Sequence, residues 1–122
     1  MAENKQYITQ VQDNGRVMIS EDVIATIALQ SLTDIEGFVG LSSKPGADIA
    51  EMLGKKNWGK GLKVSIGEAD ELSIECNTLI SYGASVVNVA KAIQEAIIGA
   101  LNSMTGVTAV TVNVNVCGIV RQ

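Results

Sequence analysis

Hydrophobic and polar residues alternate with a period of two over three stretches of this chain. The pattern covers residues 62–66, 72–80 and 107–116, and this period predicts half-buried strands. The turn at 67–71 closes the first two stretches into a hairpin. The third stretch has valine at positions 110, 112, 114 and 116, and Thr or Asn between them. We expect the valine face to pack under helices and the Thr/Asn face to meet solvent or a partner.

Two other stretches have the helical period. Residues 20–35 and 85–104 each begin at a serine suited to capping, and a glycine able to end the helix follows each of them. The second stretch has one apolar stripe, formed by Val86, Val89, Ala90, Ile93, Ile97, Ala100, Leu101 and Met104. Short apolar runs at 16–19 and 38–41 predict further strands, and residues 49–53 predict a short helix.

The resulting order, β-α-β-(α)-β-β-α-β, predicts an α+β fold. We expect a two-layer sandwich in which helices pack on one face of a mixed β-sheet. A chain of 122 residues fits a single domain. We place that domain at residues 16–118, with a polar N-terminal tail at 1–15 and a short C-terminal tail at 119–122.

Composition narrows the possible functions. Aromatic residues make up 3% of the chain and the net charge is -4, so a dedicated nucleic-acid binder is disfavoured. The polar N-terminus lacks the apolar core of a signal peptide, and no stretch is long and apolar enough to cross a bilayer. We therefore expect a cytoplasmic protein without direct membrane insertion.

Motifs for catalysis are incomplete. The chain has no histidine, which excludes a Ser-His-Asp or Cys-His site within it. Gly54-x-x-x-x-Gly59-Lys60 approaches a phosphate-binding loop, but Gly61 stands where Ser or Thr is required. We expect no enzyme activity, no cofactor and no metal.

The remaining reactive or charged side chains have plain structural interpretations. Cys76 and Cys117 fall at apolar strand positions, which predicts buried free thiols, with a disulfide or a reactive thiol as the alternative. Glu68, Asp70 and Glu71 crowd the hairpin turn without the spacing of a calcium loop, which predicts a solvated turn.

One segment is a candidate contact surface. Lys55, Lys56, Lys60 and Lys63 are four of the nine basic residues, and Trp58 lies among them. One interpretation is a solvated loop whose tryptophan folds back onto the core. The other is a patch that binds a partner or an anion, because Trp beside cations is typical of interfaces.

Several segments together resemble the alkaline shock protein family, also called the envelope stress response family, of mainly Gram-positive bacteria. The resemblance covers about residues 15–118. It rests on 16–20 with 23–28, 35–37 with 39–40, 53–61, 82–83 leading into 89–95, 104–107 and 112–116.

The resemblance implies a non-enzymatic cytosolic protein linked to cell-envelope homeostasis. Some members are held at the inner face of the membrane by an integral membrane partner, some self-associate, and others are tied to fatty-acid metabolism. The family has no agreed catalytic or ligand residues, and its Gly-Lys-Lys-Asn loop matches residues 54–57.

Two functions follow as expectations. The first is an adaptor or scaffold that binds protein partners, a membrane-anchoring protein among them, and itself as a homo-oligomer. The alternative is a regulatory protein that binds a fatty-acid-pathway enzyme or an anionic small molecule through the basic loop 54–61.

Overall fold

The structure is a computed structural model that describes residues 7–41 and 61–121. Its main sheet has four strands: β3 (Phe38–Leu41), β4 (Leu62–Ile66), β5 (Leu72–Ser81) and β6 (Val110–Val120). The expected short helix at 49–53 and all of the basic loop except Gly61 lie outside the described residues.

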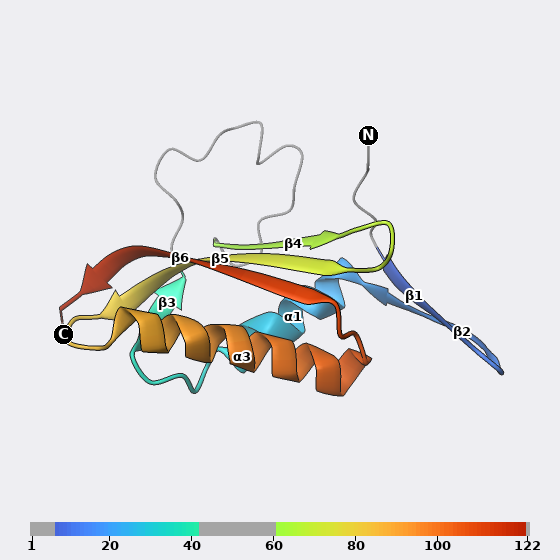
Figure 1. Cartoon of the computed structure of the whole chain (residues 1–122), viewed down its shortest axis with the longest axis horizontal. Coiled ribbons are helices and arrows are strands. Elements are labelled where there is room, and N and C mark those ends of the chain that lie inside the picture. Colours follow the sequence, from blue (N-terminus) through green and yellow to red (C-terminus); the bar gives the residue numbers. More distant parts are fainter. Residues whose placement is uncertain (1–6, 42–60, 122) are drawn as a thin grey trace.

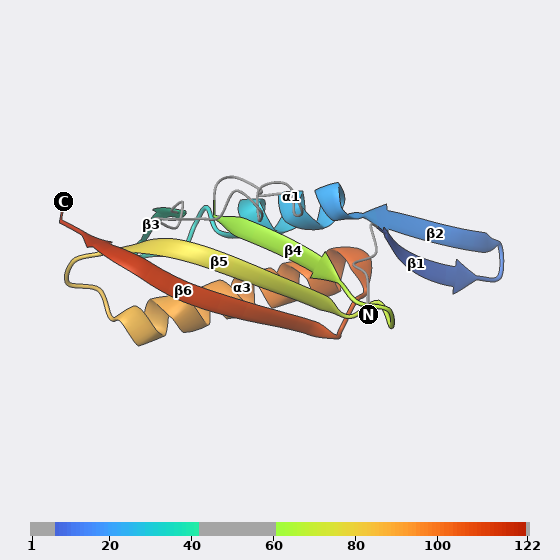
Figure 2. The same ribbon diagram turned by 90° about the horizontal axis from the view of Figure 1, so that it is seen from above.

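Strand β5 is the centre of this sheet (Figures 1 and 2). Both β4 and β3 pair antiparallel with it, β4 along its first half and β3 along its second half. On the other edge, β6 runs parallel to β5 over the whole length, from Leu72 opposite Val110 to Ser81 opposite Val120. The sheet is therefore mixed, as predicted.

Both described helices, α1 (Glu21–Ser31) and α3 (Val86–Thr105), lie on the same face of the sheet (Figure 1). The hydroxyl of Ser20 accepts a hydrogen bond from the Val23 amide, and Ser85 accepts one from the Asn88 amide, each at 3.4 Å. Gly106 ends α3 in the left-handed conformation with φ 79°. The caps predicted at Ser20, Ser85 and Gly106 and the two-layer α+β sandwich are confirmed, whereas Gly37 does not cap the first helix, whose C-cap is Leu32.

Helix α1 ends at Ser31, four residues earlier than its period predicts. The hydroxyls of Ser31 and Thr33 donate to the carbonyls of Ala28 and Gln30. Such local bonds compete with helix continuation, so the chain leaves the helix and turns toward β3.

The core lies between the helices and the inner face of the sheet. It consists almost entirely of aliphatic side chains, because the chain has few aromatic ones. Its fully buried large members are Ile8, Ile24, Leu32, Leu62, Ile66, Leu72, Ile74, Ile80, Ile93, Ile97 and Leu101.

A separate two-stranded hairpin lies beyond the end of the main sheet (Figure 2). Its strands are β1 (Tyr7–Gln12) and β2 (Gly15–Ser20), paired antiparallel from Tyr7 opposite Ser20 to Gln12 opposite Gly15. We call these two strands the hairpin arm. The expectation of a polar tail at 1–15 is thus wrong for residues 7–12. Thr and Gln interrupt the apolar pattern of this segment, and it forms a strand by pairing with β2.

The C-terminal end also differs from expectation. Strand β6 continues through Val120, into the segment expected as a tail, because its pairing with β5 extends to Ser81 opposite Val120. A register shift between Thr78 and Leu79 lets β6 keep pairing beyond Val116.

Candidate interaction surfaces

The five residues predicted as a contact patch are not brought together by the described structure. Lys63 lies on β4, and Lys55, Lys56, Trp58 and Lys60 fall outside the described residues. Lys63 stands directly opposite Glu75 of β5, on the face of the sheet that α1 and α3 do not cover. Opposite charges at such a position support each other, so Lys63 is part of the sheet surface.

Amide side chains continue this polar row onto β6. The Asn115 side-chain amide donates to the Glu75 carboxylate and to the Asn77 side-chain oxygen, each at 3.0 Å. Asn77 is buried although it points away from the helices. Asn115 of the predicted Thr/Asn face therefore cross-links β6 to β5 and supports the register of the two strands.

The hairpin arm exposes apolar side chains. Ile8 is buried at its base, and the Gln10 side-chain amide donates to the Thr105 carbonyl at 2.6 Å, so the base is anchored on α3. Every residue from 11 to 18 is exposed. The pairing places Tyr7, Val11 and Met18 on one face, with Val11 84% exposed.

A two-stranded hairpin without a packed face is marginally stable in water. The exposed apolar side chains of the arm also lie close together, and the surfaces of soluble proteins seldom have contiguous apolar patches. These three side chains, which we call the arm face, are therefore a candidate contact surface. The sequence pattern placed Tyr7 and Val11 in a tail and Met18 in a short strand.

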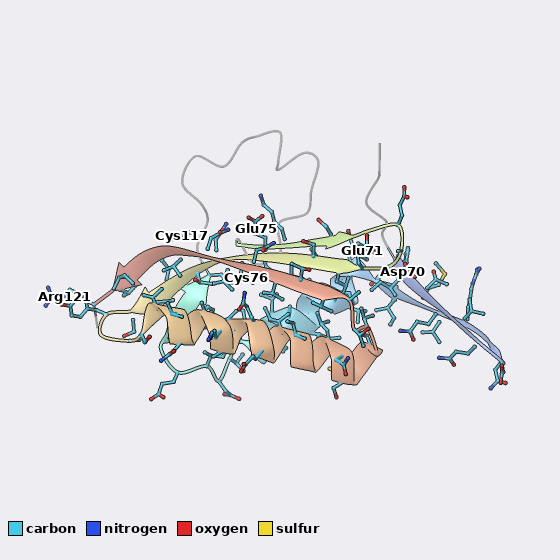
Figure 3. The ribbon with its side chains drawn as sticks, viewed as in Figure 1. Asp70, Glu71, Glu75, Cys76, Cys117 and Arg121 are labelled. Atoms are coloured by element: carbon cyan, nitrogen blue, oxygen red, sulfur yellow. The ribbon has the colours of Figure 1, made fainter. Side chains whose placement is uncertain are left out.

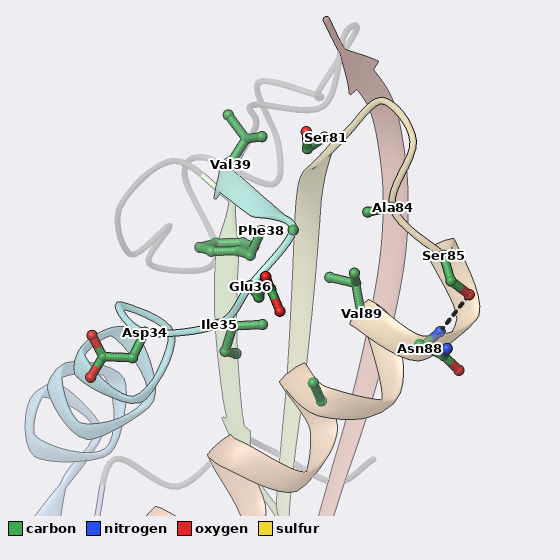
Figure 4. A pocket seen from close by; sticks show the side chains of 12 residues that line it. Asp34, Ile35, Glu36, Phe38, Val39, Ser81, Ala84, Ser85, Asn88 and Val89 are labelled. Atoms are coloured by element: carbon green, nitrogen blue, oxygen red, sulfur yellow. Dashed lines mark hydrogen bonds between the residues drawn. The ribbon is translucent and has the colours of Figure 1, made fainter. Parts of the chain in front are cut away.

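A cleft of about 850 Å³ lies between the segment that leads into β3 and the first turns of α3 (Figure 4). Ile35, Phe38 and Val89 supply apolar walls, and Asp34 and Glu36 supply carboxylates. Its volume is in the range of small-molecule sites. The sequence offers no signal for this cleft, because its walls come from segments about fifty positions apart in the chain.

The two cysteines differ in environment (Figure 3). Both are free thiols, but only Cys76 is buried, and the expectation that Cys117 is buried is wrong. Burial and the nearby Glu75 carboxylate raise the pKa of Cys76 from 9.0 to about 12. Cys117 follows Asn115 by two positions, so the alternation of β6 places it on the outer Thr/Asn face, and it is exposed there.

The acidic turn has the predicted form. The Gly67 amide donates to the Glu71 carbonyl at 2.8 Å, and the Asp70 amide donates to the Gly67 carbonyl at 3.1 Å. Within residues 7–41 and 61–121, no three His, Cys, Asp or Glu side chains are grouped as metal ligands would be. Neither described helix is long and apolar enough to span a membrane.

A family model matches residues 9–121, which include the hairpin arm from Thr9, the sheet and both helices. The model is that of the alkaline shock protein 23 family, described as having a cell envelope-related function. The chain belongs to this family. The resemblance found in the sequence is thereby confirmed.

The relatives are proteins of Gram-positive bacteria. The uncharacterized protein Spy1614 of Streptococcus pyogenes serotype M6 is 38% identical over 108 residues, which are 87% of this chain and 88% of the relative. The uncharacterized proteins YqhY and YloU of Bacillus subtilis strain 168 are 30% and 31% identical, over 86% of this chain and 77% and 88% of their own lengths. No solved structure matches the chain with significance.

Proposed function

We propose that this member of the alkaline shock protein family is a non-enzymatic adaptor in the cell envelope response. It binds protein partners, a membrane-anchoring protein among them, at the cytoplasmic face of the membrane, and it binds itself. The cell-envelope setting comes from the family. The binding role rests on one observation, the exposed apolar arm face.

The arm face suits an adaptor because it is held at a defined position and still projects from the core. Ile8 and Gln10 fix its base, while strands β1 and β2, which include Val11 and Met18, extend beyond the end of the sheet (Figure 2). An anchored arm costs less conformational entropy on binding than a disordered tail does. Burying the exposed apolar area in a partner would provide the favourable free energy.

The test is capture from a membrane fraction of a Gram-positive host by the immobilised protein. We expect the double variant Val11→Ser with Met18→Ser to capture the partner roughly tenfold less, since two apolar contacts are removed. Val23→Ser is the matched control, because Val23 is an exposed valine on α1. Equal capture by the wild type and the double variant would refute the role of the arm.

A further inference from the structure

We propose that the outer edge of β6 pairs antiparallel with the same strand of a second copy, so that two sheets join into one. The inference rests on the proposed function and deepens it by naming the surface of self-association. It is carried by the backbone of β6, by its side-chain pattern and by the flank of α3 beside it.

The first observation is that β6 has a neighbour on one side only. In the described part of the chain it pairs with β5 and with no other strand. The Leu72 amide donates to the Ala109 carbonyl at 2.8 Å, so Ala109 faces β5. Because alternate residues of a strand bond to opposite sides, the backbone groups of Val112, Val114 and Val116 point away from β5.

A hydrogen bond from the helix layer agrees with this orientation. The Gln94 side-chain amide donates to the Val112 carbonyl at 3.0 Å, on the side away from β5. This bond covers one group of the edge and leaves the amides and carbonyls of Val114 and Val116 turned outward. An extended edge of this kind is a template for another strand.

The second observation identifies the occupant as a second copy. Residues 110–116 read Val-Thr-Val-Asn-Val-Asn-Val, so the apolar and polar positions are the same in both directions. When two copies of this strand pair antiparallel about a two-fold axis, each valine therefore lies opposite a valine and each polar residue lies opposite a polar residue. Like charges opposite each other would oppose such self-pairing, but residues 110–120 include no charged side chain.

Strand edges that must stay monomeric usually have lysine, proline or an inward charge. This edge has none of these between 110 and 120. A basic or acidic partner would find no complementary charge along the strand, whereas an identical strand meets no repulsion.

The third observation concerns the flank of α3 beside the edge. Gln94 fixes which side of α3 lies next to β6. Val87, seven residues before it, and Ile98, four residues after it, share that side by helical period. Val87 is 64% exposed, and Val116 on the strand is 37% exposed. A two-fold at β6 brings the two α3 flanks together and removes these side chains from water.

The experiment measures the oligomeric state of the purified full chain by sedimentation over a range of concentrations. We expect a dimer in the wild type, and we expect Val116→Lys to raise the dimer dissociation constant roughly tenfold or more, because this register puts a lysine against Val110 of the other copy at both ends of the pairing. Val17→Lys is the matched control, since Val17 lies on the arm with 44% exposure, and its dissociation constant should equal that of the wild type.

Hydrogen exchange gives a second readout. The Val114 and Val116 amides should be protected in the wild type at high concentration and exchange rapidly in the monomeric variant. If Val116→Lys does not fold, Asn113→Lys is the second variant, because residue 113 is exposed on the outer face at the centre of the register and the two lysines would lie opposite each other.

A monomeric wild type, or a dimer unaffected by both lysine variants, would overturn the proposal. The adaptor function is tested separately. If Val116→Lys is monomeric and still captures the membrane partner, the adaptor role is unaffected. If the wild type forms the β6 dimer but captures no membrane partner, the adaptor role is refuted and the edge pairing is supported.

Discussion

At the scale of the residue, Gly37 has a conformation and a position that no other residue type fits. Its φ is +89°, and a Cβ added there would lie 2.8 Å from Val89 Cγ2 and 3.1 Å from Ala84 Cβ. Gly37→Ala should lower the free energy of unfolding by about 2 kcal/mol, from backbone strain and the clash together. Chemical denaturation measures this change.

Gly99→Ala is the matched control for that substitution. Gly99 is within α3, and nothing lies within 4 Å of an added Cβ. The alanine should raise the free energy of unfolding by about 0.5–1 kcal/mol, because it lowers the entropy of the unfolded chain. If Gly99→Ala lowered the free energy of unfolding as much as Gly37→Ala does, steric fit at Gly37 could not be the cause of the loss.

The buried Cys76 thiol makes stability depend on pH. Its pKa is about 12 in the fold against 9.0 ordinarily, so the neutral thiol is favoured in the native state. This stabilisation is complete below the unfolded pKa and is lost as pH rises toward the folded pKa. Between about pH 8 and about pH 11 the wild type should lose about 2 kcal/mol more than Cys76→Ala. Parallel pH profiles in urea denaturation would contradict this.

At the scale of the element, the start of α3 depends on a single side chain. The Ser85 hydroxyl accepts from the Asn88 amide at the N-terminus of the helix. Ser85→Ala should lower the free energy of unfolding by about 1 kcal/mol. Ser103→Ala, at an exposed position near the other end of α3, should leave it within about 0.5 kcal/mol of wild type. Thermal denaturation of both variants distinguishes loss of the cap from loss of any serine.

The elements were predicted unequally well. The sequence located α3, β4, β5 and β6, because each has a sustained period and a cap or turn at its end. It missed β1, where Gln10 and Thr9 interrupt the apolar pattern. Gln10 has a tertiary partner, the Thr105 carbonyl, which lies 95 positions away. A local pattern carries no information on such a partner.

The candidate surfaces were predicted less well than the fold. Of the five proposed contact residues only Lys63 is described, and it stands opposite Glu75 in the sheet. The arm face and the cleft were missed because each is assembled from segments that meet only after folding. The Thr/Asn face was anticipated, since its period of two marks a face of a strand directly.

At the scale of the whole molecule, the sheet should be most stable at its centre. Strand β5 is paired along both edges, whereas residues 11–18 at the tip of the arm are all exposed. We expect the amides of Ile74 and Cys76 to exchange with solvent several orders of magnitude more slowly than those of residues 11–17. Native-state hydrogen exchange would measure this gradient, and uniform protection from arm to core would contradict the architecture.

The chain's own pattern determined which faces of each element are apolar, where the helices begin, and the α+β class. Tertiary structure alone decided that β6 lies parallel to β5 with no strand of the described residues on its other edge, that Asn77 is buried and Cys117 exposed, and that residues 7–12 become a strand. The physical reason is that the face of a helix or strand consists of side chains, and the sequence specifies each of them directly. An edge is made of backbone groups that are alike at almost every position, so only the assembled fold decides which edge is left for a partner.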